Sequence, residues 1–423
     1  MIERITTANG AEILGYPNPA LHSFCLCLYV KAGPLYETPQ ENGISHFFEH
    51  MAFRGINAAM DGGLYRAADK LGITMNAVTY KEFIQFRITG ATVNFKESAA
   101  ILCRIFAPFT VPMREIGIER RRIKSELRES DEKNSLEYFS QKIIWKDTSL
   151  SGTILGRHKN LDRFGAGTLA KAQKTLLSVN NLFFCVTGNY GKNGLHELAK
   201  LLEAAPLCVT AEKRTNTAPV PDGFGRRNAA IHVKNSRGEH VVRFSFDMES
   251  ARYTTAEHYL LYDLLFSGEC SKFFRGLSDD SGMVYSYDAA IEKYNNIGTV
   301  SFLYEIGATD VLRSVEKVVD ILCDLKKGVT DELDYCRPVY VTNADMLLDE
   351  PEELNFQIGY EARIMEKPFL SLEERKASFC ACTPERMTEI VREVFTPDHL
   401  VLTFKENAKR LDIEKVRAIL ARL

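Results

Sequence analysis

The sequence has no apolar run long enough to cross a membrane as a helix, and residues 1–15 lack the basic start and apolar stretch of a secretion signal. It also has no excess of positive charge, since the formal net charge is −3. Such a chain is not expected to bind nucleic acid or an anionic membrane surface. The densest basic cluster, Arg120-Arg121-Arg122, is flanked by glutamates, so we interpret it as helix surface. We therefore expect a cytoplasmic protein with no nucleic-acid partner and no membrane partner.

The ten cysteines are scattered and give no disulfide framework, which would be unusual in a chain of this length without an export signal. Two pairs are Cys-x-Cys, at Cys25/Cys27 and at Cys380/Cys382. Successive side chains of a strand alternate between its faces, so Cys25 and Cys27 would share one face. We interpret that pair as packing residues and not as a metal site.

The length of 423 residues exceeds one ordinary core and predicts two domains of about 200 residues each. A polar stretch with prolines and threonines, residues 212–228, is the best candidate linker. The prediction is therefore a first domain at 1–211 and a second domain at 229–423. Residues 24–31 and 83–89 alternate apolar with polar side chains, as half-buried antiparallel strands do.

The second half repeats the plan of the first half weakly. The segment Tyr253 to Gly268 resembles Glu37 to Gly55, and both end in Phe-x-Gly. Setting Phe266 on Phe53 gives an offset of 266 − 53 = 213. The pattern predicts an α+β fold of two homologous domains, each a mostly antiparallel sheet with helices packed on one face. At that offset the residues opposite His46, Glu49 and His50 are Tyr259, Tyr262 and Asp263, so we expect the metal site in the first copy alone.

The run His46-Phe47-Phe48-Glu49-His50 lies in an amphipathic stretch bounded by Gly43 and Gly55. Two histidines four residues apart lie one turn above each other on the same face of a helix. Their imidazole nitrogens can then bind a single zinc ion, with Glu49 beside them as a base. The order His-x-x-Glu-His is that of the inverzincin peptidases. The alternative is a partly buried helix whose histidines hydrogen-bond to backbone or water.

A catalytic zinc ion usually has three protein ligands and one position for water, so a third ligand is needed. The charged stretch Arg114 to Lys133 has helical periodicity and no proline. Glu119 and Glu126 are seven residues apart and share a face of this helix, so one could bind the metal while the other orients a ligand. Spacing alone does not choose between Glu119, Glu126 and Glu129. A helix this charged can also be plain protein surface.

The segment Leu35 to Gly55, LYETPQENGISHFFEHMAFRG, resembles the signature of the pitrilysin/insulinase family of zinc peptidases. Leu71 to Thr79, LGITMNAVT, is similar to a second block of that family. The resemblance continues through Gly152 to Gly156 and Asn181 to Gly188 into the second half, so it covers nearly the whole chain. The branch that it resembles most is that of the two-domain processing peptidases.

The resemblance implies a set of site residues. The family's third ligand follows the second histidine at a spacing that this chain meets at Glu126, since 126 − 50 = 76. One zinc ion per chain would then be bound by His46, His50 and Glu126. Glu119 would support a ligand from behind, and Glu49 would be the catalytic base. This ligand set also accepts manganese or cobalt.

In that family an arginine and a tyrosine of the second domain, seven residues apart, reach the substrate. The matching stretch, Lys272 to Tyr287, supplies Tyr285 as a catalytic residue, but the position seven residues earlier is Ser278. Arg275 lies about one turn before it and is a candidate replacement. Because some two-domain members are heterodimers that divide these residues between chains, the serine points towards a partner chain.

The resulting hypothesis is a zinc metalloendopeptidase that cleaves peptides or unfolded segments in a chamber between two clam-shell halves. The substrate would dock as an extended strand beside Asn76 and Ala77. We expect a homodimer or a heterodimer with a related chain. The alternatives are the catalytic subunit of a heterodimeric protease that matures precursor peptides, and a non-catalytic scaffold member of the family.

Overall fold

A computed structural model describes residues 2–130, 134–209 and 213–423. The chain forms two compact units, neither of which is continuous in sequence. Unit 1 comprises the described parts of 1–131, 152–216 and 346–369, and unit 2 the described parts of 132–151, 217–345 and 370–423. The boundaries 1–211 and 229–423 did not anticipate that each half supplies a segment to the other unit. The predicted junction at residues 211 and 212 lies outside the described residues.

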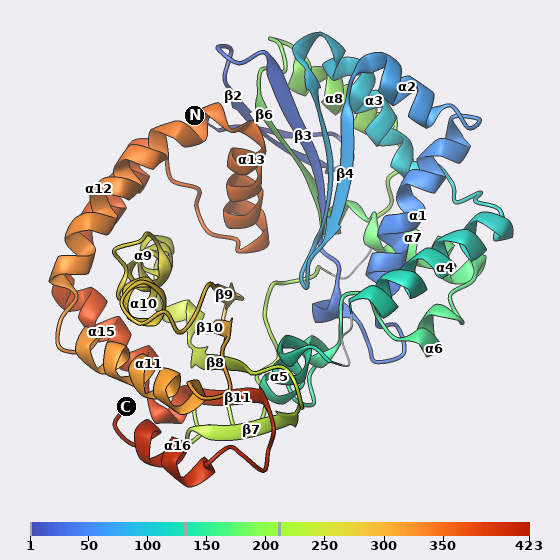
Figure 1. The fold of residues 1–423 in the computed structure, drawn as a ribbon. Coiled ribbons are helices and arrows are strands. Elements are labelled where there is room, and N and C mark those ends of the chain that lie inside the picture. Colours follow the sequence, from blue (N-terminus) through green and yellow to red (C-terminus); the bar gives the residue numbers. More distant parts are fainter. Residues whose placement is uncertain (1, 131–133, 210–212) are drawn as a thin grey trace. The chain divides into compact units, whose positions relative to one another are not determined.

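Unit 1 contains a six-stranded sheet in the order β1-β2-β6-β3-β5-β4, in which only β2 and β6 are parallel neighbours. Its strands are β1 (Glu3–Thr6), β2 (Glu12–Pro17), β3 (Ser23–Val30), β4 (Thr74–Thr79), β5 (Ile84–Ala91) and β6 (Leu182–Gly188). Helices cover one face of this sheet (Figure 1), where Phe24, Leu26 and Leu28 are fully buried. These helices include α1 (Ile44–Ala59), α2 (Leu64–Leu71), α3 (Phe95–Cys103) and α8 (Gly194–Glu203). Further helices of the unit are α4 (Met113–Glu129), α6 (His158–Leu161) and α7 (Ala166–Leu176).

The other face of this sheet is covered as well, by α13 (Pro351–Gly359) from the second half of the sequence (Figure 1). The predicted half-buried strand β3 is therefore buried on both faces. Cys25 and Cys27 lie in the core beneath α13, as predicted for packing residues, with their Sγ atoms 3.6 Å apart. The alternation along β3 indicated its apolar face correctly, but it could not show that a helix some 330 residues later would cover the other face.

Unit 2 contains a five-stranded sheet in the order β7-β11-β8-β10-β9, with only β7 and β11 parallel. Its strands are β7 (Ala230–Asn235), β8 (Val241–Met248), β9 (Tyr287–Lys293), β10 (Gly298–Glu305) and β11 (Leu400–Glu406). Its helices include α5 (Leu136–Ile144), α9 (Thr255–Phe266), α10 (Lys272–Phe274), α11 (Val311–Leu325), α12 (Thr330–Met346), α14 (Leu372–Ala381), α15 (Pro384–Val394) and α16 (Ile413–Leu420). The two units confirm the α+β class and the prediction of two similarly built, mostly antiparallel domains.

None of the helices formed by residues 2–130, 134–209 and 213–423 combines the length and the apolar composition needed to cross a bilayer. All ten cysteines are free thiols in this structure, which therefore contains no disulfide bond.

Candidate metal centre

Helix α1 carries the two histidines and is held from two sides. Phe48 packs into the core beneath the first sheet, whereas Phe47 and Met51 pack with Ile116 and Ile123 of α4. Apolar side chains on two sides of α1 therefore fix the predicted amphipathic helix. The predicted stop at Gly55 is wrong, because α1 continues to Ala59. A Cβ atom at position 55 would meet no neighbour within 4 Å, so Gly55 is a solvent-facing position inside the helix and does not end it.

The first turn of α1 is fixed by a buried carboxylate. Glu37 accepts hydrogen bonds from the backbone N–H of Gly43 at 2.8 Å, from that of Ser45 at 2.9 Å and from the Asn42 side chain at 3.1 Å. Gly43 has φ of 98°, and a Cβ atom there would lie 2.7 Å from the Cα atom of Gly156. A negative charge at a helix N-terminus complements the helix dipole and satisfies its free donors. This role of Glu37 was not predicted from the sequence.

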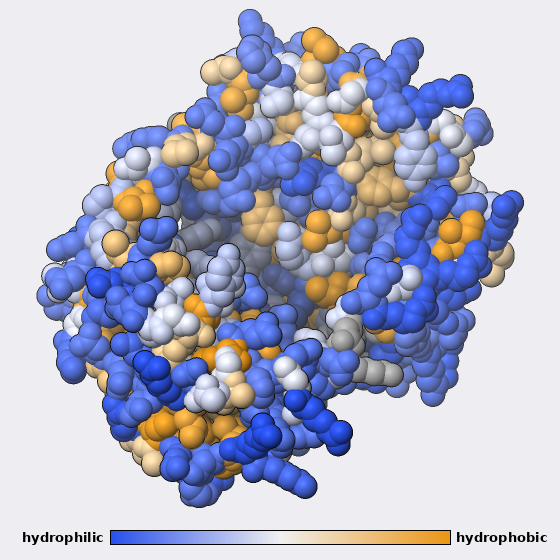
Figure 2. All heavy atoms as spheres, in the orientation of Figure 1, coloured by the Kyte–Doolittle hydropathy of each residue, from blue (hydrophilic) through white to orange (hydrophobic). Residues whose placement is uncertain are grey.

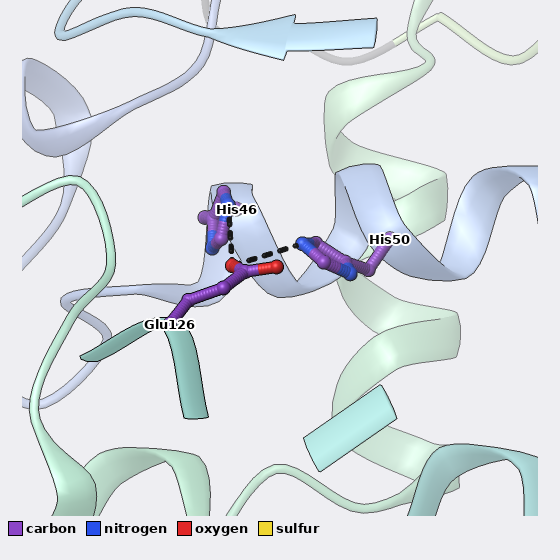
Figure 3. A group of neighbouring side chains, drawn as sticks. All are labelled: His46, His50 and Glu126. Carbon is purple, nitrogen blue, oxygen red and sulfur yellow. Dashed lines mark ion pairs between the residues drawn. The ribbon is translucent and has the colours of Figure 1, made fainter. Parts of the chain in front are cut away.

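His46, His50 and Glu126 converge at one point (Figure 3). An oxygen of Glu126 lies 3.7 Å from Nε2 of His46 and 3.5 Å from Nε2 of His50. One ligand atom from each of the three side chains can be chosen so that all lie within 4.8 Å of one another. Within the described residues, this is the one group of His, Cys, Asp and Glu side chains with that property.

These separations fit a metal ion better than they fit hydrogen bonds. Distances of 3.5 and 3.7 Å exceed the usual N–H···O range. Two atoms that each bind a tetrahedral zinc ion at about 2.0–2.1 Å lie roughly 3.4 Å apart. The set of two imidazoles and one carboxylate is also the ligand type of many catalytic zinc sites. The side chains present therefore fit the ion that the sequence analysis expects.

The ionisation of His46 suits a metal ligand. Burial, and then the neighbouring charge of His50, lower the pKa of His46 to about 3. The imidazole is therefore neutral near pH 7 and keeps a lone pair for a metal. Its Nδ1 atom is buried and has no hydrogen-bond partner among the described residues.

Glu119 orients His50 from behind. It is 1% exposed, and its Oε2 atom lies 3.1 Å from Nδ1 of His50. That contact places the proton on Nδ1 and turns Nε2 towards Glu126. Burial raises the pKa of Glu119, but hydrogen bonds from His50 and Arg54 outweigh this effect and lower it to about 2. Burial lowers the pKa of His50, yet Glu119 and the nearby carboxylates raise it overall.

Arg54 was not predicted as a residue of this site, although it lies four residues after His50 and so on the same face of α1. It donates from Nε and Nη2 to one oxygen of Glu119, at 2.9 and 2.7 Å. It also pairs with Glu115 at 2.8 Å. The i, i+4 spacing was a detectable signal, but its partner on α4 could not be read from it.

Glu49 lies beside the three converging side chains, with its carboxylate 3.8 Å from Nε2 of His46. The hydroxyl of Thr79 donates to it at 3.2 Å from the end of β4. Burial raises the pKa of Glu49 to about 7, although the charge of His50 opposes the rise. A carboxylate that is half-protonated near neutral pH is suited to accept and return a proton.

Helix α4 has a buried face, which bears Ile116, Glu119 and Ile123, and a charged face that is exposed to solvent. Glu129 is exposed near the end of the helix and accepts a hydrogen bond from Ser125, and is not part of the converging group. The surface over α4 is mostly hydrophilic in Figure 2, as a charged helix predicts. Of the three glutamates left open by spacing, the structure brings Glu126 to the histidines and Glu119 behind them.

The remaining predicted residues occupy two places. Asn76 and Ala77 lie on β4, which is the edge strand of the first sheet. Tyr285 belongs to unit 2 and precedes β9, with its side chain 97% exposed. Ser278 lies in the π-helical turn Arg275–Asp279, and Arg275 pairs with Asp280 at 3.6 Å. The roles of these residues stay predictions.

Comparisons with known proteins agree on a family. Residues 17–158 match the model of the insulinase family, peptidase family M16. An uncharacterized zinc protease of Bacillus subtilis is 22% identical over 403 residues, which covers 94% of this chain and 97% of that one. The mitochondrial-processing peptidase subunit beta of Blastocladiella emersonii is 24% identical over 60% of this chain and 53% of its own. A solved structure, the peptidase M16 inactive domain from Pseudomonas fluorescens, has a TM-score of 0.83 at 15% identity, covering 96% of this chain and 98% of that one.

Proposed function

We propose that this chain is a zinc-dependent endopeptidase of the insulinase family, peptidase family M16, with one zinc ion bound by His46, His50 and Glu126. The observation that carries the proposal is the convergence of these three side chains, with Glu49 beside them. A scaffold protein has no physical need for two imidazoles and two carboxylates at one point, with His50 and Glu49 held there by hydrogen bonds to Glu119 and Thr79.

A zinc ion bound there would lower the pKa of a water molecule and polarise the carbonyl group of a peptide bond. Glu49 accepts the proton of the attacking water on its carboxylate and delivers it to the leaving amine. The hydroxyl of Thr79 holds that carboxylate towards the histidines. Glu119 keeps the imidazole of His50 in the tautomer with a free Nε2 lone pair.

The substrate is an extended peptide or an unfolded segment that pairs with the free edge of β4 beside Asn76 and Ala77. Edge strands offer unpaired backbone N–H and C=O groups, and an added strand satisfies them regardless of most side chains. The end of β4 bears Thr79, which contacts Glu49, so a paired peptide passes the proposed base.

The direct test uses the purified full chain beside Glu49→Gln. We expect about one zinc ion per chain in both proteins by metal analysis, and cleavage of a quenched unstructured peptide by the unmodified chain alone. Loss of the base should lower kcat/KM by roughly 10²- to 10⁴-fold. A chelator should abolish cleavage, and zinc should restore it. A chain that binds no zinc contradicts the proposal.

A second candidate is a peptidase that needs a partner chain, as in a heterodimeric protease that matures precursor peptides. The observation that favours it is Ser278, which stands where the resemblance predicts an arginine, while Arg275 pairs with Asp280. A subunit of this kind would bind zinc but cleave only after a related chain is added. A chain that binds zinc and stays inactive with every related partner would instead be the non-catalytic scaffold.

A further inference from the structure

A cavity of about 720 Å³ lies within unit 1, against strands β4 and β5 and the start of α13. Its lining includes Val78 and Tyr80 near the end of β4, Arg87 of β5, and Glu352, Glu353 and Phe356 of α13. The side chain of Val78 is 37% exposed, which is unusual for a valine of a packed sheet. The cavity therefore opens next to the strand on which the proposed substrate pairs.

The cavity and the metal centre lie on opposite faces of β4. Successive side chains of a strand point to opposite faces. Met75 and Ala77 pack into the core beneath α1, and Thr79 donates to Glu49. The alternate residues Val78 and Tyr80 line the cavity.

A peptide strand paired with β4 continues this alternation. The residue opposite Thr79 presents its side chain to the face of Glu49, and its neighbours in sequence present theirs to the face of the cavity. The cavity can therefore sample a substrate side chain next to the one at the proposed base.

The cavity has an apolar wall and an acidic rim. The rings of Tyr80 and Phe356 lie 5.7 Å apart between centroids and offer a surface for a hydrocarbon stem. Three glutamates line the rim, at positions 350, 352 and 353. Arg87 is the one cation of the lining, and it pairs with Glu352 at 2.7 Å. Glu353 also accepts a hydrogen bond from Gln357 at 3.0 Å. The lining thus carries more negative than positive charge.

We propose that this cavity is a specificity pocket for a lysine or arginine side chain of the substrate, located one residue from the substrate residue that lies opposite Thr79. A long basic side chain matches such a lining, because its stem packs on aromatic surface while its cation reaches carboxylates. The inference rests on the proposed function, since it takes the edge of β4 as the substrate-binding strand.

The test measures binding and cleavage separately. Fluorescent peptides that differ at one position, lysine against methionine, are titrated into the zinc-loaded full chain carrying Glu49→Gln, which does not turn them over. The substituted position is scanned along the peptide. We expect a preference for lysine of roughly fivefold at alternate positions, as for partly exposed ion pairs with two carboxylates. The preference should shrink as salt is added.

Variants of the lining must move this preference in opposite directions. The double variant Glu350→Gln with Glu353→Gln should reduce the lysine preference to less than about twofold. Arg87→Gln should increase the preference, because the carboxylate of Glu352 then loses its ion pair with Arg87. The double variant Glu97→Gln with Glu373→Gln is the matched control, because both residues are exposed and lie outside the lining. Its two substitutions remove the same total charge. This control should leave the preference unchanged.

The outcomes separate the two proposals. Equal binding of lysine and methionine peptides, no binding at all, or a preference that the control abolishes equally would overturn the pocket. A lysine preference of the Glu49→Gln chain, together with no cleavage by the unmodified chain, would support the pocket and count only against self-sufficient peptidase activity.

Discussion

Helices α1 and α9 occupy matching positions in the two units, but they differ in how their N-termini are capped and in the polar side chains that they carry. The N-terminus of α1 is capped by a buried carboxylate from the preceding loop, Glu37, whereas α9 has a capping box formed by Thr254 and Glu257. The position of His50 is taken on α9 by Asp263, which accepts a hydrogen bond from Ser267, the residue that follows this helix. A duplicated fold therefore preserves the helix while its few polar side chains decide whether a metal centre can form.

Each half of the sequence also supplies one helix to the other unit, α13 to unit 1 and α5 to unit 2. The two helices contain buried polar residues that differ in their hydrogen bonds. In unit 1, Asn355 of α13 is fully buried and donates to the backbone carbonyls of Cys25 and Cys185, at 3.2 and 2.9 Å, while Tyr29 donates to it at 3.0 Å. In unit 2, Ser140 of α5 meets Thr403 of β11 through one hydroxyl contact of 2.6 Å. Asn355 therefore makes more buried hydrogen bonds to the rest of its unit than Ser140 does.

The largest effect is expected from breaking the metal centre itself. His46→Ala should lower bound zinc from about one ion per chain to nearly none, because two ligands rarely retain the ion against buffer. Tyr259→Phe, at the matching position of α9, should leave zinc content unchanged. Metal analysis of the two dialysed proteins checks this, and equal zinc loss in both would contradict the assignment to α1.

The second largest effect is expected from removing the buried hydrogen bonds of α13 and α5. Asn355→Ala should lower the free energy of unfolding by about 3 kcal/mol, because two buried carbonyls lose the hydrogen bonds donated by its amide and the Tyr29 hydroxyl loses one of its acceptors. Ser140→Ala should cost about 1 kcal/mol, since a single hydroxyl contact is lost. Urea titration followed by circular dichroism gives both values. Similar costs would show that Asn355 contributes no more to the free energy of unfolding than Ser140 does.

The contact behind His50 should matter less than the ligands. Glu119→Gln should weaken zinc binding roughly 10- to 100-fold, as loss of an outer hydrogen-bonding carboxylate does elsewhere. Competition with a chromogenic chelator measures the affinity. Asp263→Asn, a change of the same kind on α9, is the control and should leave the affinity as it was.

The smallest effect is expected at the cap of α9. Glu257 pairs with Arg386 at 2.7 Å. Burial raises the pKa of Glu257, but the Thr254 backbone and Arg386 outweigh this and lower it below 4.5. A lowered pKa gives stability that is present above about pH 4.5 and is lost as the pH falls through the folded-state value. Glu257→Gln should therefore cost up to about 1 kcal/mol at pH 7 and progressively less in acid, by urea titration at several pH values. A cost independent of pH would exclude the charge as its cause.

Much of this molecule was predictable because local patterns carry the information. The spacing of His46 and His50 places both on one face of any helix, and the apolar positions of α1 showed that a helix forms there. The alternation along β3 and β5 likewise gave strands, and the weak repeat gave two similar domains. The pattern was less informative at Gly55, where a helix can accept a glycine that nothing contacts.

The sequence by itself determined the helix with its two histidines and Glu49, since these depend on neighbours within two turns. Only the tertiary structure decided which glutamate of α4 meets them, that Arg54 braces Glu119, and that α13 covers the second face of the first sheet. Each of these depends on segments that are 65 to some 330 residues apart in sequence. No local periodicity records where such segments meet, because packing of whole elements brings them together.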